Sequence, residues 1–496
     1  MPPKRRSDTI SEKTIPSKTR RSGTKFSLRD SIEYEECDEY INANIIPSAN
    51  DSGESNLDDE SDCESENNFS EADDSFSFEN KIMLNQIQKS KILSSTPTEL
   101  FELFFSLDLK NHIVNCTEKN GYKMSITDFN VFVGIIIFTM YNKRLSQRDY
   151  WSREPHLKAE PVSSSMSRLN FETIKSKIKF HQSEDQNDAD RVWRVRTLIN
   201  IFRKNLIQFG IFSTALSIDE MMLKFYGRSV LKQFIKGKPK RFGIKLWALC
   251  SSNGFLFDFD VYCGKSNQKT EKLAKCALGS RVVVNMLQVV FSTVTLRKRD
   301  QLHIYFDNLF TCPDLLVHLK KYGLVATSTV RANRVEVKNA VTDKDERGKF
   351  EVKCDKQSGI NFITIMDSKP VSILSSAVGV TPSGTVERRV KGQKERKELK
   401  FPRAFMIYNQ FMGGVDLHDQ RCNAIEPTIR SKKWTWTIFV RMIQSAMTNA
   451  TILYNLCHEH KVSTKFVAMS VGKEYLNRSK VSKPDLHETE QQKLPR

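Results

Sequence analysis

Three aspartates stand in sequence contexts that could assemble a metal-dependent site for phosphoryl transfer. Asp219 lies in LSIDEMM, Asp307 in HIYFDNLF and Asp416 in FMGGVDLHDQ. The first two follow apolar, β-rich runs, whereas the third follows a Gly-Gly pair and opens a stretch of helical character. Mg²⁺ is usually held by a few carboxylates and substrate phosphate, and two ions about 3.5–4 Å apart can stabilise both oxygens of the transfer. Carboxylates converging from strand ends and a helix would suit such a site.

Each of these aspartates, taken alone, also has a structural explanation, because Asp often accepts hydrogen bonds from free backbone amides at strand ends and helix starts. Asp419 lies three residues after Asp416 and therefore on the same side of a helix, where it could equally be a capping or salt-bridge carboxylate. Glu220 would point to the opposite face of its strand from Asp219, so it is not counted as a ligand.

Longer strings surround the aspartates and favour the functional interpretation. They are SIDEMMLKFYGRSVLKQFIKGKPKRFGIKLWALC, then FDNLFTCPDLL followed by STVRANR, and IMDSKPVSILSS followed by YNQFMGGVDLHDQ. YWSREP and MSRLNFETIKSKIKFHQ precede them in the chain. Over roughly residues 95–460 these strings resemble the piggyBac transposase family in their residues, order and spacing, with 88 and 109 residues between successive aspartates.

The resemblance implies an α/β fold in which a ribonuclease H-like catalytic core carries an insertion and is flanked by a mainly helical dimerisation and DNA-binding domain. It implies that Asp219, Asp307 and Asp416 are catalytic, and that they and Asp419 hold two Mg²⁺ ions, for which Mn²⁺ could substitute. Water would nick a transposon end, and the freed 3′-OH would form a hairpin and later join target DNA at TTAA. The implied partners are double-stranded DNA, both transposon ends and TTAA target, and a second copy of the chain in a homodimer.

Basic residues near these motifs are predicted to contact DNA phosphates, since Lys and Arg beside such a site position the backbone without identifying bases. They are Arg228, Lys238, Lys240, Arg241, Lys245, Arg331 and Arg334. Each of them could instead be a plain surface charge.

The periodicity of apolar residues predicts the elements that must position these groups. From about 95 to 210 it is helical, and from 214 it predicts strands at 215–223, 244–250, 255–262, 303–306 and 324–330, with helices at 282–294 and 313–322. The apolar stripe from Trp434 to Met447 is expected to pack back on the first helical part. The predicted division of the chain is 1–85, a disordered basic then acidic region; 90–213, helical domain; 214–333, catalytic core; 334–400, insertion; 401–425, return to the core; 426–475, second part of the helical domain; and 476–496, polar tail.

Charge is distributed unevenly along the chain. The formal net charge is +18, to which residues 1–30 contribute +6 and residues 31–80 contribute −17, so residues 81–496 carry +29. A strongly basic body favours a polyanionic partner. Basic runs at Lys4–Arg6 and Lys18–Arg21 could direct nuclear import, and a nuclear location is expected. The chain shows no C-x₂-C pair and no apolar run long enough to span a bilayer, so neither a zinc ribbon nor a membrane partner is expected.

Three functions remain open at this stage. The three acids favour an active transposase. The family usually ends in a cysteine-rich zinc-binding domain, whereas no cysteine follows Cys457 here. That difference predicts weak recognition of specific transposon ends and favours a domesticated, DNA-binding nuclear protein without catalytic activity. A nuclease of the same fold is the third and weakest possibility.

Removal of residues 1–85 is expected to strengthen binding to duplex DNA, because the acidic arm competes with DNA for the basic body as a tethered polyanion. The measurement is the dissociation constant of the full chain and of the truncated chain across a series of salt concentrations. An affinity that does not change between low and moderate salt would contradict the electrostatic interpretation.

Overall fold

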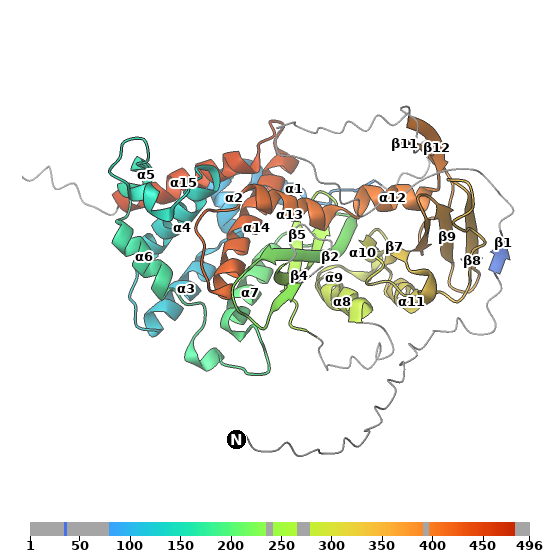
Figure 1. Cartoon of the computed structure of the whole chain (residues 1–496), viewed down its shortest axis with the longest axis horizontal. Helices are drawn as coiled ribbons and strands as arrows, with labels where there is room; N and C mark the ends of the chain where they lie inside the picture. Colours follow the sequence, from blue (N-terminus) through green and yellow to red (C-terminus); the bar gives the residue numbers. More distant parts are fainter. Residues whose placement is uncertain (1–33, 37–78, 235–241, 265–277, 390–395, 482–496) are drawn as a thin grey trace, which may run out of the picture.

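The computed structural model describes residues 34–36, 79–234, 242–264, 278–389 and 396–481. Along its long axis a helical region at one end is followed by a mixed sheet and then by a strand-rich region (Figure 1). The predicted fold class, an α/β core with an insertion flanked by a helical domain, is confirmed. Within the described ranges, no helix combines the length and the apolar composition needed to cross a bilayer.

The helical region is built from both ends of the described chain. Its α-helices are α1 (Gln86–Ser94), α2 (Pro97–Phe104), α3 (Leu107–Lys119), α4 (Ile126–Tyr141), α5 (Glu160–Ser163), α6 (Arg168–Lys177), α7 (Trp193–Leu206), α14 (Trp434–Cys457) and α15 (Thr464–Val481). As predicted, the apolar stripe of α14 packs on the first part: the rings of Trp436 and Phe132 lie 6.0 Å apart, and those of Phe439 and Phe105 lie 6.2 Å apart.

A partly buried carboxylate ties α15 to the N-terminal helices. Glu102 of α2 pairs with Lys110 of α3 at 2.5 Å and with Arg478 of α15 at 2.9 Å, and it accepts a hydrogen bond from Tyr475. Burial alone would raise the pKa of Glu102, but the bonds from Arg478 and Lys110 outweigh it and lower the pKa to about 2. Leu476 is also buried, and α15 continues to Val481. The chain therefore remains helical beyond residue 476, where the polar tail was predicted to begin.

The central sheet has the strand order expected of a ribonuclease H-like core. Its strands are β2 (Ala215–Lys224), β3 (Lys232–Phe234), β4 (Phe242–Ser251), β5 (Leu256–Val261), β6 (His303–Phe306) and β7 (Val325–Val330). The order β5-β4-β2-β6-β7 is antiparallel through β5, β4 and β2 and parallel through β2, β6 and β7. The connecting helices are α8 (Leu278–Met286), α9 (Gln288–Thr293), α10 (Leu296–Arg299) and α11 (Pro313–Lys321), so the single helix predicted at 282–294 is interrupted at Leu287.

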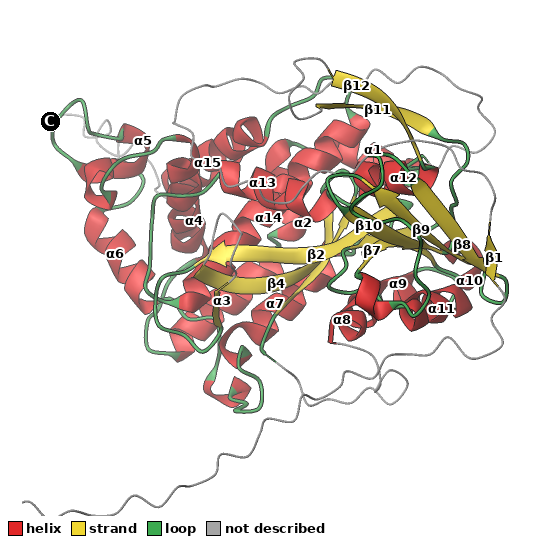
Figure 2. Ribbon diagram, turned by 45° about the vertical axis from the view of Figure 1, so that its right-hand side comes forward, coloured by secondary structure: helices red, strands yellow, loops and turns green. Residues whose placement is uncertain are grey.

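The first part of the insertion extends this sheet. Strands β8 (Phe350–Asp355), β9 (Ile360–Met366) and β10 (Pro370–Ser375) form an antiparallel meander, and β10 pairs with β7. Strands β11 (Gly384–Arg389) and β12 (Arg396–Phe401) form a separate pair. Helices α12 (Arg403–Phe411) and α13 (Gly414–Ala424) then return the chain to the central sheet. In Figure 2 the long strands β2 and β4 of this sheet lie side by side and extend to the helical region.

Two parts of the region predicted to be disordered belong to the described fold. Strand β1 (Tyr34–Glu36) pairs with the edge strand β8, which places Glu36 opposite Lys353. The segment before α1 also packs on the core: Met83 N–H donates to Phe212 O at 2.7 Å, and Leu84 is buried. A truncation that keeps the contacts of Met83 and Leu84 with the core should therefore remove only residues before 79.

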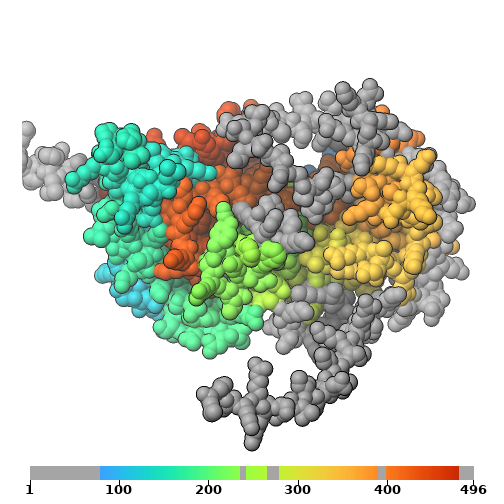
Figure 3. Space-filling model, viewed as in Figure 1, coloured from blue at the N-terminus to red at the C-terminus, as the bar shows by residue number. Residues whose placement is uncertain are grey.

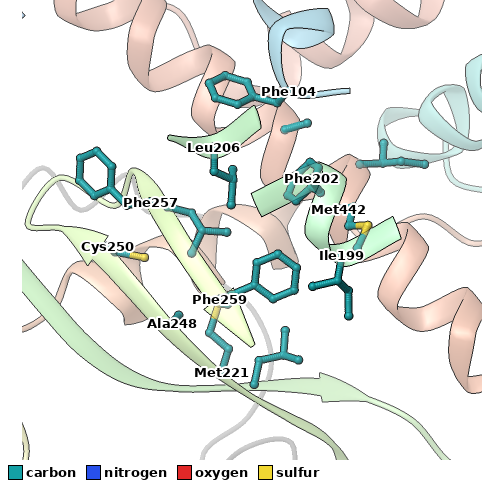
Figure 4. Packing of buried hydrophobic residues seen from close by; sticks show 14 of the residues in the cluster. Phe104, Ile199, Phe202, Leu206, Met221, Ala248, Cys250, Phe257, Phe259 and Met442 are labelled. Carbon is teal, nitrogen blue, oxygen red and sulfur yellow. The ribbon is translucent and has the colours of Figure 1, made fainter. Parts of the chain in front are cut away.

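One apolar core joins the helical region to the sheet. In Figure 4, Ile199, Phe202 and Leu206 of α7 point toward side chains of β2, β4 and β5, with Met442 of α14 beside them. The rings of Phe202 and Phe259 lie 6.0 Å apart. Close packing across this boundary fixes the strand ends relative to the helices, which is the condition for a rigid site between them.

Candidate active site

Asp219 and Asp307 lie where two neighbouring parallel strands part. The ladder between β2 and β6 pairs Ala215 with His303 and ends at the pair Ile218 and Phe306, so the two aspartates are the next residue on each strand. Adjacent strands lie about 4.8 Å apart, which keeps these two positions close. Asp219 itself lies inside its strand, as the predicted strand at 215–223 implies, because β2 continues to pair with β4 as far as Lys224.

Asp307 opens a tight turn that its own groups stabilise. One carboxylate oxygen accepts the N–H of Leu309, and the Asp307 carbonyl accepts Phe310 N–H at 3.1 Å and Thr311 Oγ1 at 2.9 Å. Arg334 holds the turn from outside, since its Nη1 donates to the carbonyls of Asn308 at 2.7 Å and Thr311 at 2.7 Å. The direction of the Asp307 side chain is thus set by local bonds.

Asp416 reaches the same region because α13 begins in direct contact with the sheet. A Cβ built on Gly414 would lie 2.2 Å from Ser251 O of β4 and 2.6 Å from Ser217 Oγ of β2, so only glycine fits this contact. Ser217 is two residues before Asp219, and Asp416 is two residues after Gly414 in the first turn of α13, where its side chain is exposed. The second glycine of the motif, Gly414, therefore has a packing function.

Hydrogen bonds to the β4–β5 turn fix α13 in this orientation. The buried His418 contacts Gly254 O through Nδ1 at 2.8 Å and Ser445 Oγ through Nε2 at 2.9 Å. Arg421 Nη1 donates to Asn253 O at 2.6 Å. Gly254 has φ +86°, which completes the turn that the Ser-Ser-Asn-Gly sequence predicts.

The buried Tyr408 lies within electrostatic range of all three carboxylates. Burial raises the pKa of Tyr408 on α12, and the negative charges of Asp307, Asp219 and Asp416 raise it further. Burial likewise raises the pKa of Cys250 on β4, with added contributions from several groups that include Asp219 and Asp416. Tyr408 was not singled out from the sequence, although it lies only eight residues before Asp416 in the same motif.

Asp419 is bound to protein groups. Its carboxylate lies 3.0 Å from Nη1 of Arg441 on α14, and Asn423 Nδ2 donates to its other oxygen at 3.0 Å. Arg441 is buried, with an exposed fraction of 6%. Asp419 therefore forms a salt bridge, which was the structural alternative to metal binding. A metal ion could bind Asp419 only if its carboxylate were shared between the ion and Arg441.

The three remaining aspartates have the donor chemistry that a hard divalent cation requires. Carboxylate oxygens are the protein ligands that Mg²⁺ takes, and substrate phosphate and water usually supply the rest. Among the described residues, no three His, Cys, Asp or Glu side chains lie close enough to form a complete metal site on their own. Asp219, Asp307 and Asp416 would therefore hold such an ion together with the phosphate of the substrate.

The predicted phosphate-binding residues fall into three groups. Arg228 and Arg331 are exposed, although Arg331 Nε donates to Asn308 Oδ1 at 2.8 Å. Lys245 pairs with Glu220, and the Nζ of Lys245 lies 4.1 Å from the centre of the Trp247 ring. Only 13% of the Lys245 side chain is exposed. Arg334 is engaged by the turn after Asp307, as described above. Lys238, Lys240 and Arg241 lie outside the described residues.

Comparisons with known proteins agree on one family. A family model described as Transposase IS4 matches residues 96–451. PiggyBac transposable element-derived protein 3 of Homo sapiens is 30% identical over 378 residues, which cover 74% of this chain and 62% of that protein. PiggyBac transposable element-derived protein 2 of Homo sapiens is 30% identical over 383 residues, which cover 75% and 63%. The chain thus spans less than two thirds of the length of these relatives.

A solved structure also has the same fold. The cryo-EM structure of a piggyBac transposase synaptic complex with hairpin DNA matches with a TM-score of 0.66 at 22% sequence identity. The match covers 82% of this chain and 85% of that chain.

The substitution Gly414→Ala is expected to destabilise the protein by about 1–3 kcal/mol, because the added methyl would force α13 away from β2 and β4. The matched control is Gly413→Ala, since a Cβ at Gly413 would meet nothing within 4 Å. Denaturant unfolding compares the two variants. Equal stability of both would contradict the close contact at Gly414.

The substitution Asp419→Asn is expected to lower the free energy of unfolding by about 1–3 kcal/mol in the absence of divalent cations, because it leaves the buried Arg441 without its counter-charge. The exposed Asp416→Asn should change this free energy by no more than about 0.5 kcal/mol. A pure metal ligand at position 419 predicts instead that both variants are as stable as the wild type without metal.

Proposed function

We infer that this chain, which belongs to the piggyBac transposase family, is a transposase or transposase-derived protein that cuts and rejoins DNA strands with the help of a divalent cation. The observation that carries the proposal is that Asp219 and Asp307 follow the end of the β2–β6 ladder on neighbouring strands, while Gly414 holds the start of α13, with Asp416, against β2. Phosphoryl transfer at a DNA backbone requires such a cluster of carboxylates to hold cations against phosphate.

The first proposed step is hydrolysis of one strand at a transposon end. The oxygen of water forms a bond to phosphorus, the bond between phosphorus and the 3′ oxygen breaks, and a 3′-OH and a 5′-phosphate remain. Bound Mg²⁺, with Mn²⁺ as a substitute, would supply the positive charge that stabilises the oxygens in transfer. Asp219, Asp307 and Asp416 would hold it, while the turn bonded by Arg334 keeps Asp307 directed at the site.

The later proposed steps use the 3′-OH as the nucleophile. It attacks a phosphodiester of the opposite strand, which closes a hairpin and releases the flanking DNA. After the hairpin opens, the 3′-OH joins target DNA at TTAA. The same carboxylates serve each transfer, because each exchanges one phosphorus–oxygen bond for another. The proposed partner is duplex DNA, and the proposed binding species is a homodimer in the nucleus. The net charge of +29 over residues 81–496 supports the binding of DNA.

A second candidate function is DNA binding without cleavage. Two human relatives are named as transposable element-derived proteins. The engagement of Asp419 by Arg441 is compatible with such a protein, because it withdraws one acidic group from any metal. The three aspartates remain in place, and for that reason cleavage is the primary proposal.

The substitutions Asp219→Asn, Asp307→Asn and Asp416→Asn are each expected to abolish Mg²⁺-dependent strand cleavage and to leave the fold intact, because a carboxamide lacks the charge that holds a cation against phosphate. Asp300→Asn is the control, since Asp300 is exposed and precedes β6 at the opposite edge of the sheet. Gel analysis of labelled duplex DNA measures cleavage. Wild-type cleavage by one of the three variants would remove that residue from the catalytic set, and no cleavage by the wild type would favour the second candidate function.

A further inference from the structure

A basic cavity lies beyond the end of β2, between the catalytic core and the helical region. It has a volume of 920 Å³ and is bounded by residues 223–228, residues 426–432 and the first turns of α14. On the face in Figure 3, the green segment that contains residues 223–228 lies against the orange-red segment that contains residues 426–432. Gly227 permits this contact, because a Cβ there would lie 2.4 Å from the Phe225 ring and 3.1 Å from Lys432 O.

The lining of this cavity is strongly positive. Its basic members are Lys143, Lys224, Arg228, Arg430, Lys432 and Arg441, whereas Glu426 is the one acidic residue among the described lining. Apart from Arg441, these basic side chains are exposed and approach from three separate parts of the chain. The repulsion between these positive charges costs electrostatic free energy, and a bound anionic ligand would lower that cost.

Arg441 gives the cavity a buried cationic floor. It is 6% exposed, and its Nε has no hydrogen-bond partner within the described part of the chain. Nη1 is ion-paired with Asp419 at 3.0 Å, and Nη2 donates to Asn423 Oδ1 at 3.2 Å. A buried guanidinium Nε–H without an acceptor is costly, and a phosphate oxygen is a suitable acceptor.

The position of the cavity relative to the aspartates indicates which anion it takes. Leu223, at its edge, is four residues beyond Asp219 on β2, which is about 13 Å along an extended strand. That distance corresponds to the rise of roughly four base pairs along the axis of B-form DNA. Asp419 links the two places directly, because it lies one turn beyond Asp416 on α13 and pairs with Arg441.

We propose that this basic cavity binds phosphodiester groups of the DNA backbone within about four base pairs, along the helix axis, of the bond that is cut. The proposal rests on the proposed function insofar as the phosphates are those of DNA. Arg228 and Arg430 on its walls and Arg441 at its floor contact the backbone and hold the scissile phosphate at the aspartates. Tyr226 at the rim, 70% exposed, offers a ring on which an unpaired base can stack.

The test compares two double variants that change charge equally. The first is Arg228→Gln with Arg430→Gln in the cavity. The matched control is Arg297→Gln with Lys298→Gln in α10, two exposed residues that precede β6 at the opposite edge of the sheet. Binding of a fluorescein-labelled 30-base-pair duplex is measured by anisotropy over a salt series, with EDTA present so that cleavage does not contribute.

The cavity variant is expected to bind the duplex about tenfold more weakly at low salt, and the slope of log K against log salt should become shallower by about 2, since each lost phosphate contact contributes about 0.9. The control should keep a slope close to that of the wild type. Equal slopes for both double variants would overturn the proposal. Because both substituted pairs are exposed, thermal unfolding should be unchanged in both.

Two further arms separate the alternatives. In the first, inorganic tripolyphosphate replaces DNA: loss of its binding by the cavity variant with unchanged duplex binding would overturn the proposal in favour of a small polyanion. In the second, Asp219→Asn is measured under the same conditions, and duplex binding at least as strong as that of the wild type is expected, because the substitution removes a negative charge that repels phosphate. If wild-type cleavage is absent while the cavity variant still loses its salt slope, the cavity assignment stands and the catalytic proposal fails.

Discussion

The register of the parallel ladder between β2 and β6 is the constraint on which the candidate site depends. This ladder ends at Ile218 and Phe306, and both acidic residues follow at once. A shift by one residue would turn Asp219 to the other face of the sheet, where Glu220 now pairs with Lys245. The apolar core shown in Figure 4 secures the register, because Met221 and Ala248 are packed beneath helix α7. The third aspartate depends on the same strand through the contact of Gly414 with Ser217.

Charges around the site are arranged in two zones. Asp219, Asp307 and Asp416 form a negative zone that would attract cations, and the basic cavity forms a positive zone that would attract DNA phosphates. Asp419 and Arg441 form an ion pair where the two zones meet. A DNA strand lying across both zones would bring phosphate to the aspartates, while neutralisation by the cavity lowers the repulsion between that strand and the carboxylates. Binding and cutting are therefore expected to be separable by substitution.

Much of the fold was predictable from the sequence because its signals are local. Apolar alternation marks β6 at 303–306 and β2 to within a residue, and the Ser-Ser-Asn-Gly turn marks the hairpin of β4 and β5. The extension of the sheet by β10 was not evident, since it depends on pairing with β7 about 45 residues earlier. The segment near Leu84 was also missed, because its partners lie more than 120 residues away.

The candidate site was predictable in its aspartates and less so in its basic residues. Strand context and motif identify Asp219, Asp307 and Asp416, but the partner of a charged side chain is a matter of tertiary structure. Arg334 looks like a phosphate contact in the sequence and instead bonds to the carbonyls after Asp307. Arg430 and Lys432 were not singled out, although they follow Asp416 by little more than a dozen residues and line the basic cavity. Their position opposite residues 223–228 appears only in three dimensions.

The most direct test of the account is iron-mediated cleavage of the protein backbone. Fe²⁺ follows Mn²⁺ in the Irving–Williams order and should occupy a site built from the same carboxylates. With ascorbate and peroxide the bound ion generates radicals that cut nearby peptide bonds, and mass spectrometry maps the cuts. Convergence of the three aspartates predicts cuts near residues 219, 307 and 416 together, all suppressed by excess Mg²⁺. Cuts that omit one of these three segments, or that persist with Mg²⁺, would contradict a single shared site.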